Sequence, residues 1–125
     1  TKTDYNDVVE DIFDYFYNKI EVLTKFGLER NKIIIDPGIG FGKTTSQNFE
    51  IIKRIPELKT LGCAILVGHS RKNFIKETVC SENTDILDTA TAILAERLIG
   101  QKVNIIRIHN VELGNMTKKL CKSLF

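Results

Sequence analysis

Three short segments rich in isoleucine, leucine and valine constrain the fold of this chain more than any other feature. They cover residues 32–36, 64–68 and 103–108, and they begin roughly 35 residues apart. Apolar, β-branched runs without strict alternation are typical of strands in a parallel sheet. The intervening chain is long enough for helical crossovers, so we expect parallel strands joined by right-handed connections.

Amphipathic helices are expected before, between and after these segments. The first repeats apolar side chains at helical spacing, with Thr3 or Asp4 as its cap and Gly27 closing its end. Pro56 lacks a backbone donor and should kink or restart the second helix. The predicted helices cover 4–26, 48–61, a short turn around 74–75, 85–99 and a last segment capped by Asn110, with Leu113, Met116, Leu120 and Leu124 facing inward.

The length of the chain limits the architecture. A complete (β/α)8 barrel needs at least ~200 residues, whereas 125 residues supply only part of one. We expect an α/β fold with parallel strands alternating with helices. It is either a small three-layer sandwich or the second half of a (β/α)8 TIM barrel, with about the last three βα units and a preceding helix. No linker divides the chain, so residues 1–125 form a single partial domain.

Composition narrows the class of protein. Lysine and arginine number 18 and aspartate and glutamate 16, so the net charge of +2 gives no footprint for nucleic acid. No apolar run approaches the ~20 residues that span a bilayer, and the N-terminus lacks the character of a signal or transit peptide. The three widely spaced cysteines, Cys63, Cys80 and Cys121, predict free thiols in a reducing compartment.

Polar residues follow all three predicted strands, which is where parallel α/β proteins place their chemistry. These segments are 36–43, 68–72 and 107–110. Arg107 and His109 are two residues apart, so both side chains should lie on one face. They are either simply solvated or, on a barrel rim, form an anion site. Their joint placement at one rim favours a functional site more than any single residue does.

Taken singly, these residues also have ordinary structural explanations. Asp36 is either a cap or solvated strand end, or a carboxylate that accepts from the paired N–H donors of a heterocycle. Ser70 caps the turn that follows it or belongs to the site. Arg71 and Lys72 are either surface cations or ligand-binding groups.

The glycine-rich segment 38–44 is similar to a phosphate-binding P-loop but fails its spacing. A P-loop requires four residues between its first glycine and Gly-Lys-Ser/Thr, whereas only three separate Gly38 from Gly42-Lys43-Thr44. A GxGxxG pattern fails as well, because Thr45 stands at the last glycine position. Nucleotide binding through Lys43 is therefore the weakest functional hypothesis.

Three segments taken together resemble the dihydropteroate synthase family. They are Asp36-Pro37-Gly38-Ile39-Gly40-Phe41-Gly42-Lys43-Thr44, Gly68-His69-Ser70-Arg71-Lys72 and Arg107-Ile108-His109, in the order and spacing of that family. The similarity extends over essentially the whole chain, including the first helix. Methyltetrahydrofolate-dependent pterin-binding domains share the fold, and the Ser-Arg-Lys segment favours the synthase.

The resemblance implies a pterin-binding (β/α)8 barrel that acts in folate biosynthesis. Such enzymes condense 6-hydroxymethyl-7,8-dihydropterin diphosphate with p-aminobenzoate, with Mg²⁺, to give 7,8-dihydropteroate and pyrophosphate. The family also implies a homodimer formed through late helices, and a cytoplasmic location, or a mitochondrial one in a eukaryote. Its metal-side residues and mobile loops precede the part matched here, so this chain is expected to contribute no metal ligand.

Residue by residue, the resemblance assigns the pterin to four positions and counts a fifth residue among the substrate-binding ones. Asp36 would hydrogen-bond the pterin ring, Lys72 would bond it as well, and Gly68 would back it. Arg107 would stack on the ring. Arg71 matches the motif and is counted among the substrate-binding residues.

The resemblance assigns the second substrate and the leaving group to neighbouring positions. Phe41 and Ser70 would border the aminobenzoate, with Lys72 beside it. Arg107 and His109 would hold the diphosphate and stabilise the charge that builds on it as it leaves. Lys72, Arg107 and His109 are therefore the predicted catalytic residues.

The chain also departs from the family pattern. Asn110 stands where the family usually has Asp, and His69 occupies a variable position. The early strands have no match, so we expect a C-terminal half completed by a missing N-terminal segment or another chain, and inactive by itself. The alternative is a non-catalytic truncated barrel that dimerises and binds at most a pterin or an anion.

Overall fold

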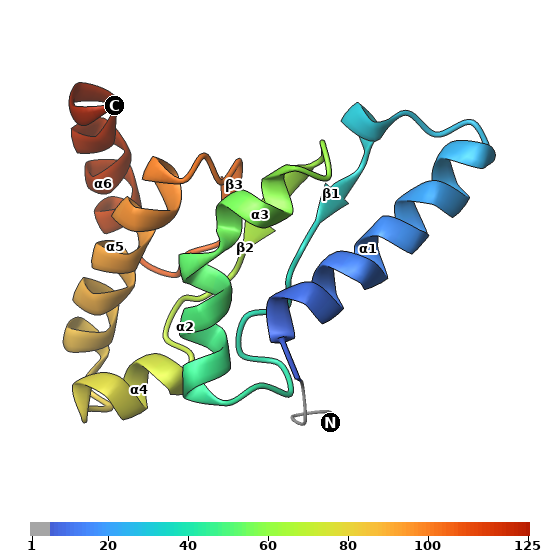
Figure 1. Cartoon of the computed structure of the whole chain (residues 1–125). Helices are drawn as coiled ribbons and strands as arrows, with labels where there is room; N and C mark the ends of the chain where they lie inside the picture. Colours follow the sequence, from blue (N-terminus) through green and yellow to red (C-terminus); the bar gives the residue numbers. More distant parts are fainter. Residues whose placement is uncertain (1–5) are drawn as a thin grey trace.

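A computed structural model describes residues 6–125 as alternating helices and strands (Figure 1). This is the α/β alternation predicted from the sequence. In chain order the elements are α1 Val8–Lys25, the 3-10 turn η1 Arg30–Lys32, β1 Ile34–Ile35, α2 Thr45–Lys53, α3 Ile55–Lys59, β2 Ala64–Val67, α4 Asn73–Val79, α5 Thr84–Gly100, β3 Ile105–Ile106 and α6 Val111–Leu124.

The three strands form one parallel sheet in the order β1-β2-β3. Ile34 pairs with Ala64 across β1 and β2, and Leu66 pairs with Ile105 across β2 and β3. The predicted parallel topology is therefore confirmed. The strands are shorter than the predicted segments, because a strand is defined by pairing, and β1 and β3 each have only β2 as a neighbour in the described chain.

Helices of the described chain cover one face of this sheet and leave the other open. Ile35 is 2% exposed and Ile65 is fully buried, whereas Ile34 is 56% and Ile105 40% exposed. Since neighbouring residues of a strand point to opposite faces, the covered face is packed and the opposite face is bare. We call the side that carries Ile34 and Ile105 the bare face. The described helices therefore cover one side of the sheet only.

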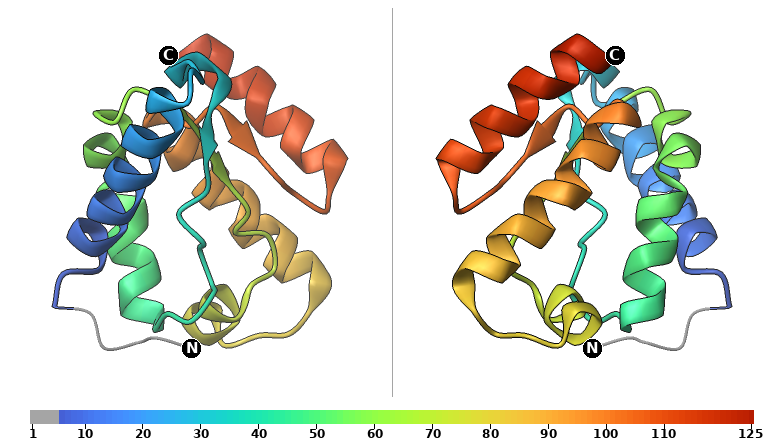
Figure 2. Two further views of the ribbon diagram at one scale, coloured as in Figure 1. Left: turned by 90° about the vertical axis from the view of Figure 1, so that its right-hand side faces the viewer. Right: turned by 90° about the vertical axis from the view of Figure 1, so that its left-hand side faces the viewer.

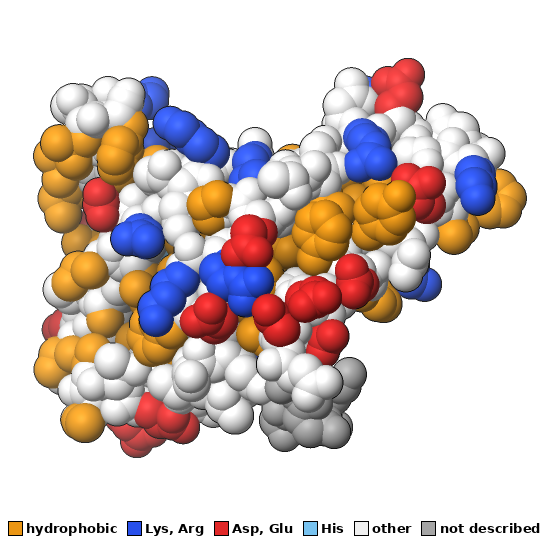
Figure 3. All heavy atoms as spheres, viewed as in Figure 1, with side chains coloured by type: hydrophobic (Ala, Val, Ile, Leu, Met, Phe, Trp, Pro, Cys, Tyr) orange, Lys and Arg blue, Asp and Glu red, His pale blue; other side chains and the backbone are white. Residues whose placement is uncertain are grey.

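The covering helices form two groups. The side views show α1 and α2 beside β1, and α5 and α6 beside β3 (Figure 2). α4 packs between the groups, with contacts to both α2 and α5. Figure 3 shows the outer helical surface, where acidic side chains surround a central basic one. Arg54 pairs with Asp7 at 2.8 Å and with Glu57 at 2.5 Å, which ties α1 to the helices that follow it.

The ends of α1 follow from its flanking residues. The helix begins at Val8, because the Asp7 carboxylate accepts from the backbone N–H of Val9 at 3.0 Å and of Glu10 at 3.1 Å. The earlier caps predicted at residues 3 and 4 lie outside the described residues. Gly27 closes the helix with a φ of +95°, as predicted, a conformation that favours glycine.

The second predicted helix is two helices. α2 begins three residues earlier than expected, with Thr44 and Gln47 forming a reciprocal capping box. The chain breaks at Arg54 and resumes in α3, where Pro56 occupies the first turn. The predicted interruption is confirmed, and it precedes Pro56 because proline is tolerated in a first turn but not in a helix interior.

The last helix buries a different side from the predicted one. Met116, Leu120 and Leu124 are 53%, 61% and 68% exposed, whereas Thr117 and Cys121 are buried against α5. The inward assignment of the three apolar residues is therefore wrong, because only α5 and β3 are present to cover this helix. Cys63, Cys80 and Cys121 are all free, as predicted. No helix in residues 6–125 is both long and apolar enough to span a bilayer.

Candidate functional site

The carboxyl ends of the three strands meet at one edge of the sheet, as the sequence predicts. The register that pairs Leu66 with Ile105 places Gly68 opposite Arg107. Asp36 follows β1 two residues after Ile34, so it starts from the bare face as well. Asp36 and Arg107 are both exposed, and the strand ends therefore present their polar groups to the side that the helices leave open.

Arg107 lies directly against the backbone of Gly68. A Cβ atom on Gly68 would stand 2.8 Å from Arg107 Cζ, well inside van der Waals contact. Gly68 does not adopt a positive φ, so a side chain here would be opposed by the Arg107 guanidinium and not by backbone strain. The end of β2 is thus a floor against which the guanidinium lies.

His109 is held by Ser70. The Ser70 hydroxyl lies 2.7 Å from His109 Nδ1 and accepts from the His109 backbone N–H at 3.1 Å. These bonds answer the open question about Ser70, which holds the third strand end and makes no cap bond to α4. A hollow of about 240 Å³ opens here, lined by Gly68, Ser70, Lys72, Arg107, Ile108 and His109.

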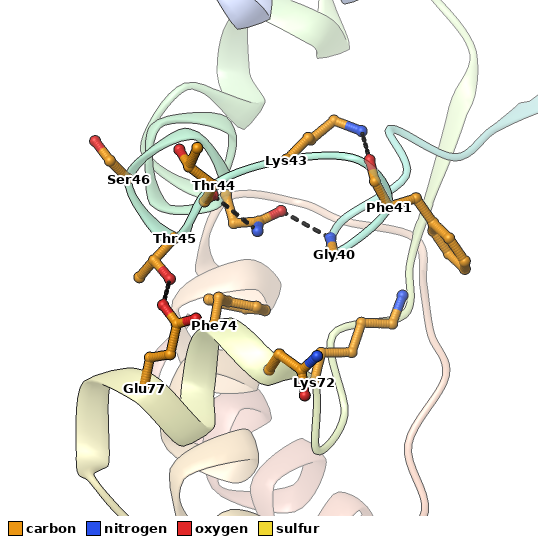
Figure 4. Close-up of a pocket in the computed structure, with 11 residues that line it drawn as sticks. Gly40, Phe41, Lys43, Thr44, Thr45, Ser46, Lys72, Phe74 and Glu77 are labelled. Carbon is orange, nitrogen blue, oxygen red and sulfur yellow. Dashed lines mark hydrogen bonds between the residues drawn. The ribbon is translucent and has the colours of Figure 1, made fainter. Parts of the chain in front are cut away.

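Lys72 reaches across to the glycine-rich loop after β1. Its Nζ donates to the Ile39 carbonyl at 2.5 Å and lies 4.3 Å from the centre of the Phe41 ring. Figure 4 shows this side chain extended toward the loop. A Cβ atom on Gly40 would stand 2.6 Å from Lys72 Cδ, so glycine is required where the lysine stem passes.

The electrostatic setting of Lys72 favours an anionic ligand. Partial burial lowers the pKa of Lys72 below its ordinary value, and the nearby Arg107 lowers it further, whereas Asp36 opposes the shift. Two cations are therefore held close together with one carboxylate nearby. A bound anion would relieve their repulsion, which is the physical basis of an anion site.

The glycine-rich loop is fixed by a buried side chain that the sequence analysis missed. Asn48 is 1% exposed, and its Oδ1 accepts from Gly40 N at 2.7 Å, while its Nδ2 donates to the Thr44 carbonyl at 3.0 Å. The Asp36 carboxylate accepts from Gly38 N at 2.8 Å, which makes the turn that follows β1. A polar residue on the inward, otherwise apolar side of α2 was the signal that could have revealed Asn48.

Lys43 does not take the position of a P-loop lysine. Its Nζ turns back and donates to the carbonyls of Gly38 and Phe41, both at 2.9 Å. Burial lowers the pKa of Lys43, and Asp36 opposes that shift. The loop thus uses this lysine to close itself, which argues against nucleotide binding through it. A second hollow, of about 720 Å³, lies between this loop, the start of α2 and α4 (Figure 4).

Arg71 points away from the other predicted site residues. Its guanidinium forms two hydrogen bonds with the Asp88 carboxylate on α5, at 2.7 and 3.0 Å. Its predicted contact with substrate stays a prediction. His69 is fully buried, with Nε2 2.9 Å from the Thr91 carbonyl, so it lies behind the rim, and burial lowers its pKa. Asn110 caps α6, as predicted, by accepting from Leu113 N at 3.0 Å.

The strand ends therefore gather charged and hydrogen-bonding groups of a kind that suits an anionic ligand. Three groups that carry charge or donate hydrogen bonds stand around the end of β2, and a carboxylate lies across from them at the end of β1. They are Arg107, Lys72, the Ser70–His109 pair and Asp36.

Comparisons with known proteins point to one family. The family model described as "Pterin binding enzyme" matches residues 1–109. A dihydropteroate synthase from Synechocystis sp. is 34% identical over 123 residues, covering 98% of this chain and 43% of that protein. A probable bifunctional folylpolyglutamate synthase/dihydropteroate synthase from Haloferax volcanii is 39% identical over 112 residues, covering 88% of this chain and 13% of that protein.

Solved structures agree with the sequence comparisons. The dihydropteroate synthase of Clostridium difficile superposes with a TM-score of 0.90 at 36% identity, covering 99% of this chain and 47% of that one. The enzyme of Anaplasma phagocytophilum with bound 6-hydroxymethylpterin-monophosphate superposes with a TM-score of 0.90 at 32% identity, covering 99% and 49%. The chain thus spans less than half the length of these relatives. Since the family model accounts for 109 of the 125 residues, the chain belongs to the pterin-binding enzyme family.

Proposed function

We propose that this chain supplies the last part of a dihydropteroate synthase barrel. The completed barrel would condense 6-hydroxymethyl-7,8-dihydropterin diphosphate with p-aminobenzoate to give 7,8-dihydropteroate and pyrophosphate. One observation carries the proposal: cations and a carboxylate converge at the strand ends of a chain whose relatives bear that enzyme's name. These residues are Arg107, Lys72, the Ser70–His109 pair and Asp36.

The pterin would lie across the end of β2. The free lone pairs of the Asp36 carboxylate suit the paired N–H donors of a pterin ring. The Arg107 guanidinium occupies the space beside Gly68, so the ring would lie against the guanidinium with Gly68 behind it. The Arg107 guanidinium is planar and lies beside that floor, so it can stack on the ring while its N–H groups bond the diphosphate.

The chemistry asks for charge stabilisation more than for a protein nucleophile. The amine nitrogen of p-aminobenzoate forms a bond to the methylene carbon of the pterin, the C–O bond breaks, and pyrophosphate leaves with the bonding electrons. The amine loses a proton to solvent. Arg107 and His109 would stabilise the charge that grows on the leaving group, and Lys72 would add a further positive charge beside them. Positioning supplies the rest.

The aminobenzoate would lie on the Lys72 side of the site. The Phe41 ring is 66% exposed and stacks under Lys72 Nζ, so it offers an aromatic edge next to a cation. An aromatic carboxylate matches both features. Ser70 lies on the other side of Lys72, where its hydroxyl already anchors His109.

The resemblance places the ligands of the Mg²⁺ in the part of the barrel outside this chain. Among residues 6–125, no group of three or more His, Cys, Asp and Glu side chains stands together in a way that would hold a metal ion. We therefore assign the metal to the part of the barrel outside this chain.

We also propose that the completed enzyme is a cytoplasmic homodimer, or a mitochondrial one in a eukaryote. Apolar side chains exposed on α5 and α6 suit the dimer that the resemblance implies. They are Ile93, Met116, Leu120 and Leu124, which are 66%, 53%, 61% and 68% exposed.

A non-catalytic partial barrel is the second candidate, and the same exposed apolar surface favours it. It would dimerise and bind at most a pterin or an anion. The two candidates differ in the completed barrel, where the enzyme requires Asp36, Lys72 and Arg107 for turnover. The isolated chain is expected to form no dihydropteroate, and turnover by the chain alone would overturn its assignment as a partial barrel.

Calorimetric titration of the chain with 6-hydroxymethyl-7,8-dihydropterin diphosphate tests the proposal. We expect saturable binding that weakens at least about tenfold in Arg107→Ala, since a charge-assisted contact is lost. Arg97→Ala is the matched control, because Arg97 is exposed on the last turn of α5 and faces no site residue. Equal affinity in wild type and Arg107→Ala, or no binding at all, would contradict the proposed pterin floor.

A further inference from the structure

A single buried carboxylate joins two of the three strand-end segments. The Asp88 side chain on α5 is 5% exposed. It accepts two hydrogen bonds from the Arg71 guanidinium, at 2.7 and 3.0 Å, and one from Asn110 Nδ2, at 3.4 Å. These bonds hold the pKa of Asp88 below its ordinary value, the Arg71 hydrogen bond being the largest cause. Asp88 is thus charged and fully engaged, and it touches no described hollow of the site.

The partners of Asp88 stand next to the predicted catalytic residues. Arg71 lies between Ser70 and Lys72 in the turn after β2, and Asn110 directly follows His109 after β3. Any movement of the Asp88 carboxylate would therefore move both turns. Through these neighbours, one side chain on the helical layer sets the separation of groups at the sheet edge.

The turn after β2 contains a residue in an unfavourable backbone conformation, which contacts from other elements must stabilise. Arg71 has a φ of +57°, which is unfavourable for a residue with a side chain and persists only where other contacts impose it. Thr91, one helical turn beyond Asp88, supplies two of these contacts. Its hydroxyl accepts from Arg71 N at 3.2 Å, and its carbonyl bonds His69 Nε2 at 2.9 Å. α5 thus clamps the turn through Asp88 and Thr91 together.

We propose that Asp88 is a positioning residue, which holds the Ser70–Lys72 turn and the His109–Asn110 turn in register so that Lys72 and His109 face one anion. The identity of that anion as a pterin diphosphate rests on the proposed function. The positioning role itself concerns only this chain's own contacts.

Asn110 is the partner that this arrangement requires. Its amide nitrogen donates to Asp88, while its amide oxygen caps α6. A carboxylate at position 110 would keep the cap but would place a second negative charge beside Asp88. The repulsion would be transmitted to the turn after β2 through Arg71. Asn110→Asp is therefore expected to perturb Lys72, which lies in a different segment of the chain.

A double-variant cycle on the 125-residue chain tests this coupling without any ligand. The readout is amide hydrogen exchange of Lys72, whose N–H donates to the His69 carbonyl at 3.2 Å. We expect Asn110→Asp to speed this exchange at least about threefold, and to do so much less in an Asp88→Asn background. Exchange at Ile20 in α1 should not change, which separates a local effect from global destabilisation.

Two results would overturn the positioning role. One is an unchanged Lys72 amide in Asn110→Asp. The other is the same change with and without Asp88→Asn, since that would mean that the effect does not pass through Asp88. If Asp88→Asn does not fold, Arg71→Lys serves as the second background, because it keeps the charge but loses the two-pronged bond.

Titration with inorganic pyrophosphate distinguishes this inference from the proposed function. Removing a negative charge alone should strengthen anion binding, and Asp85→Asn, on the exposed first turn of α5, is the matched control for that effect. We expect Asp88→Asn to weaken binding about tenfold instead, which only lost geometry explains. If wild type binds no pyrophosphate, the proposed anion site fails, and the exchange cycle still decides the role of Asp88.

Discussion

At the scale of single residues, the position of the Arg107 guanidinium depends on the absence of a side chain at Gly68. The guanidinium occupies the volume of a side chain that Gly68 does not have. This placement brings a planar cation against the end of β2. In the proposed site the role of the glycine is therefore steric.

Gly68→Ala should separate ligand binding from stability. The new methyl group would stand 2.8 Å from Arg107 Cζ, so Arg107 must move, whereas the backbone of Gly68 has no positive φ to strain. We expect affinity for a dihydropterin phosphate to fall at least about tenfold, with little change in melting temperature. Calorimetry and thermal unfolding measure the two effects. Unchanged affinity would mean that the ligand does not use this floor.

The lowered pKa of Lys72 should make anion binding weaken at a lower pH than it would with an ordinary lysine. Burial and Arg107 lower its pKa, so its charge is lost at a lower pH than usual as the pH rises. We expect pyrophosphate affinity to decline with pH accordingly, and Arg107→Ala to move the decline to higher pH. A pH series of titrations on both proteins, with Lys72→Arg as a control that stays charged, measures this. A decline that is the same in Lys72→Arg would assign it to another group.

The charged residues at the strand ends were predicted from the sequence, whereas the buried polar residues that position them were not. Asp36, Lys72 and Arg107 were found because strand ends of parallel sheets collect functional groups, a rule that uses local pattern alone. Asn48 and Asp88 were missed. Asp88 bonds Arg71 and Asn110 in two other segments, and only the folded structure brings these partners together. Asn48 bonds the neighbouring loop, and its polar side chain on an otherwise apolar helix side was overlooked.

At the scale of elements, α2 and the glycine-rich loop form one unit. Lys43 closes the loop after β1 on itself, and the buried Asn48 side chain on α2 links Gly40 to the start of that helix. The loop in turn supplies the Ile39 carbonyl that anchors Lys72. α2 thus helps to position Lys72, because Asn48 on α2 holds the loop whose Ile39 carbonyl accepts from the lysine.

Asn48→Ala should loosen this unit. The substitution removes both hydrogen bonds of a side chain that is 1% exposed, which costs about 1–3 kcal/mol in free energy of unfolding. Pterin phosphate affinity should fall as well, because Lys72 loses a fixed anchor. Ser46→Ala, at an exposed position of the same helix, is the control. Urea unfolding and calorimetry report the two quantities, and a stability equal to that of the control would contradict the role.

Element order and type could be predicted from periodicity, whereas boundaries depended on specific caps. α5 and the parallel strands lie close to their predicted positions, because both have long or strongly apolar patterns. α1 begins where Asp7 caps it, and α2 begins where Thr44 pairs with Gln47. Several side chains can cap either helix, so the choice among them is made by tertiary packing.

At the scale of the whole molecule, helices cover only one face of the sheet in the described chain. The other face, the bare face, exposes Ile34 and Ile105 to solvent. The buried side of α6 was mispredicted because hydrophobic periodicity shows which side of a helix is apolar. It does not show whether the element that covers that side lies in the same chain. Both features are as expected for a part of a barrel whose remaining strands and helices lie outside this chain.

Neighbouring isoleucines of β1 allow a test of this incompleteness. Ile35 is 2% exposed under the helices, so Ile35→Ala should cost about 2–5 kcal/mol in the isolated chain. Ile34 is 56% exposed on the bare face, so Ile34→Ala should cost less than about 1 kcal/mol there. In a completed barrel the bare face becomes the interior, and the cost of Ile34→Ala should rise toward that of Ile35→Ala. Urea unfolding of both variants, with and without the rest of the barrel, measures this difference.

Equal costs of the two substitutions in the isolated chain would show that the bare face is already covered, for example by a second copy. Sedimentation would then reveal the dimer.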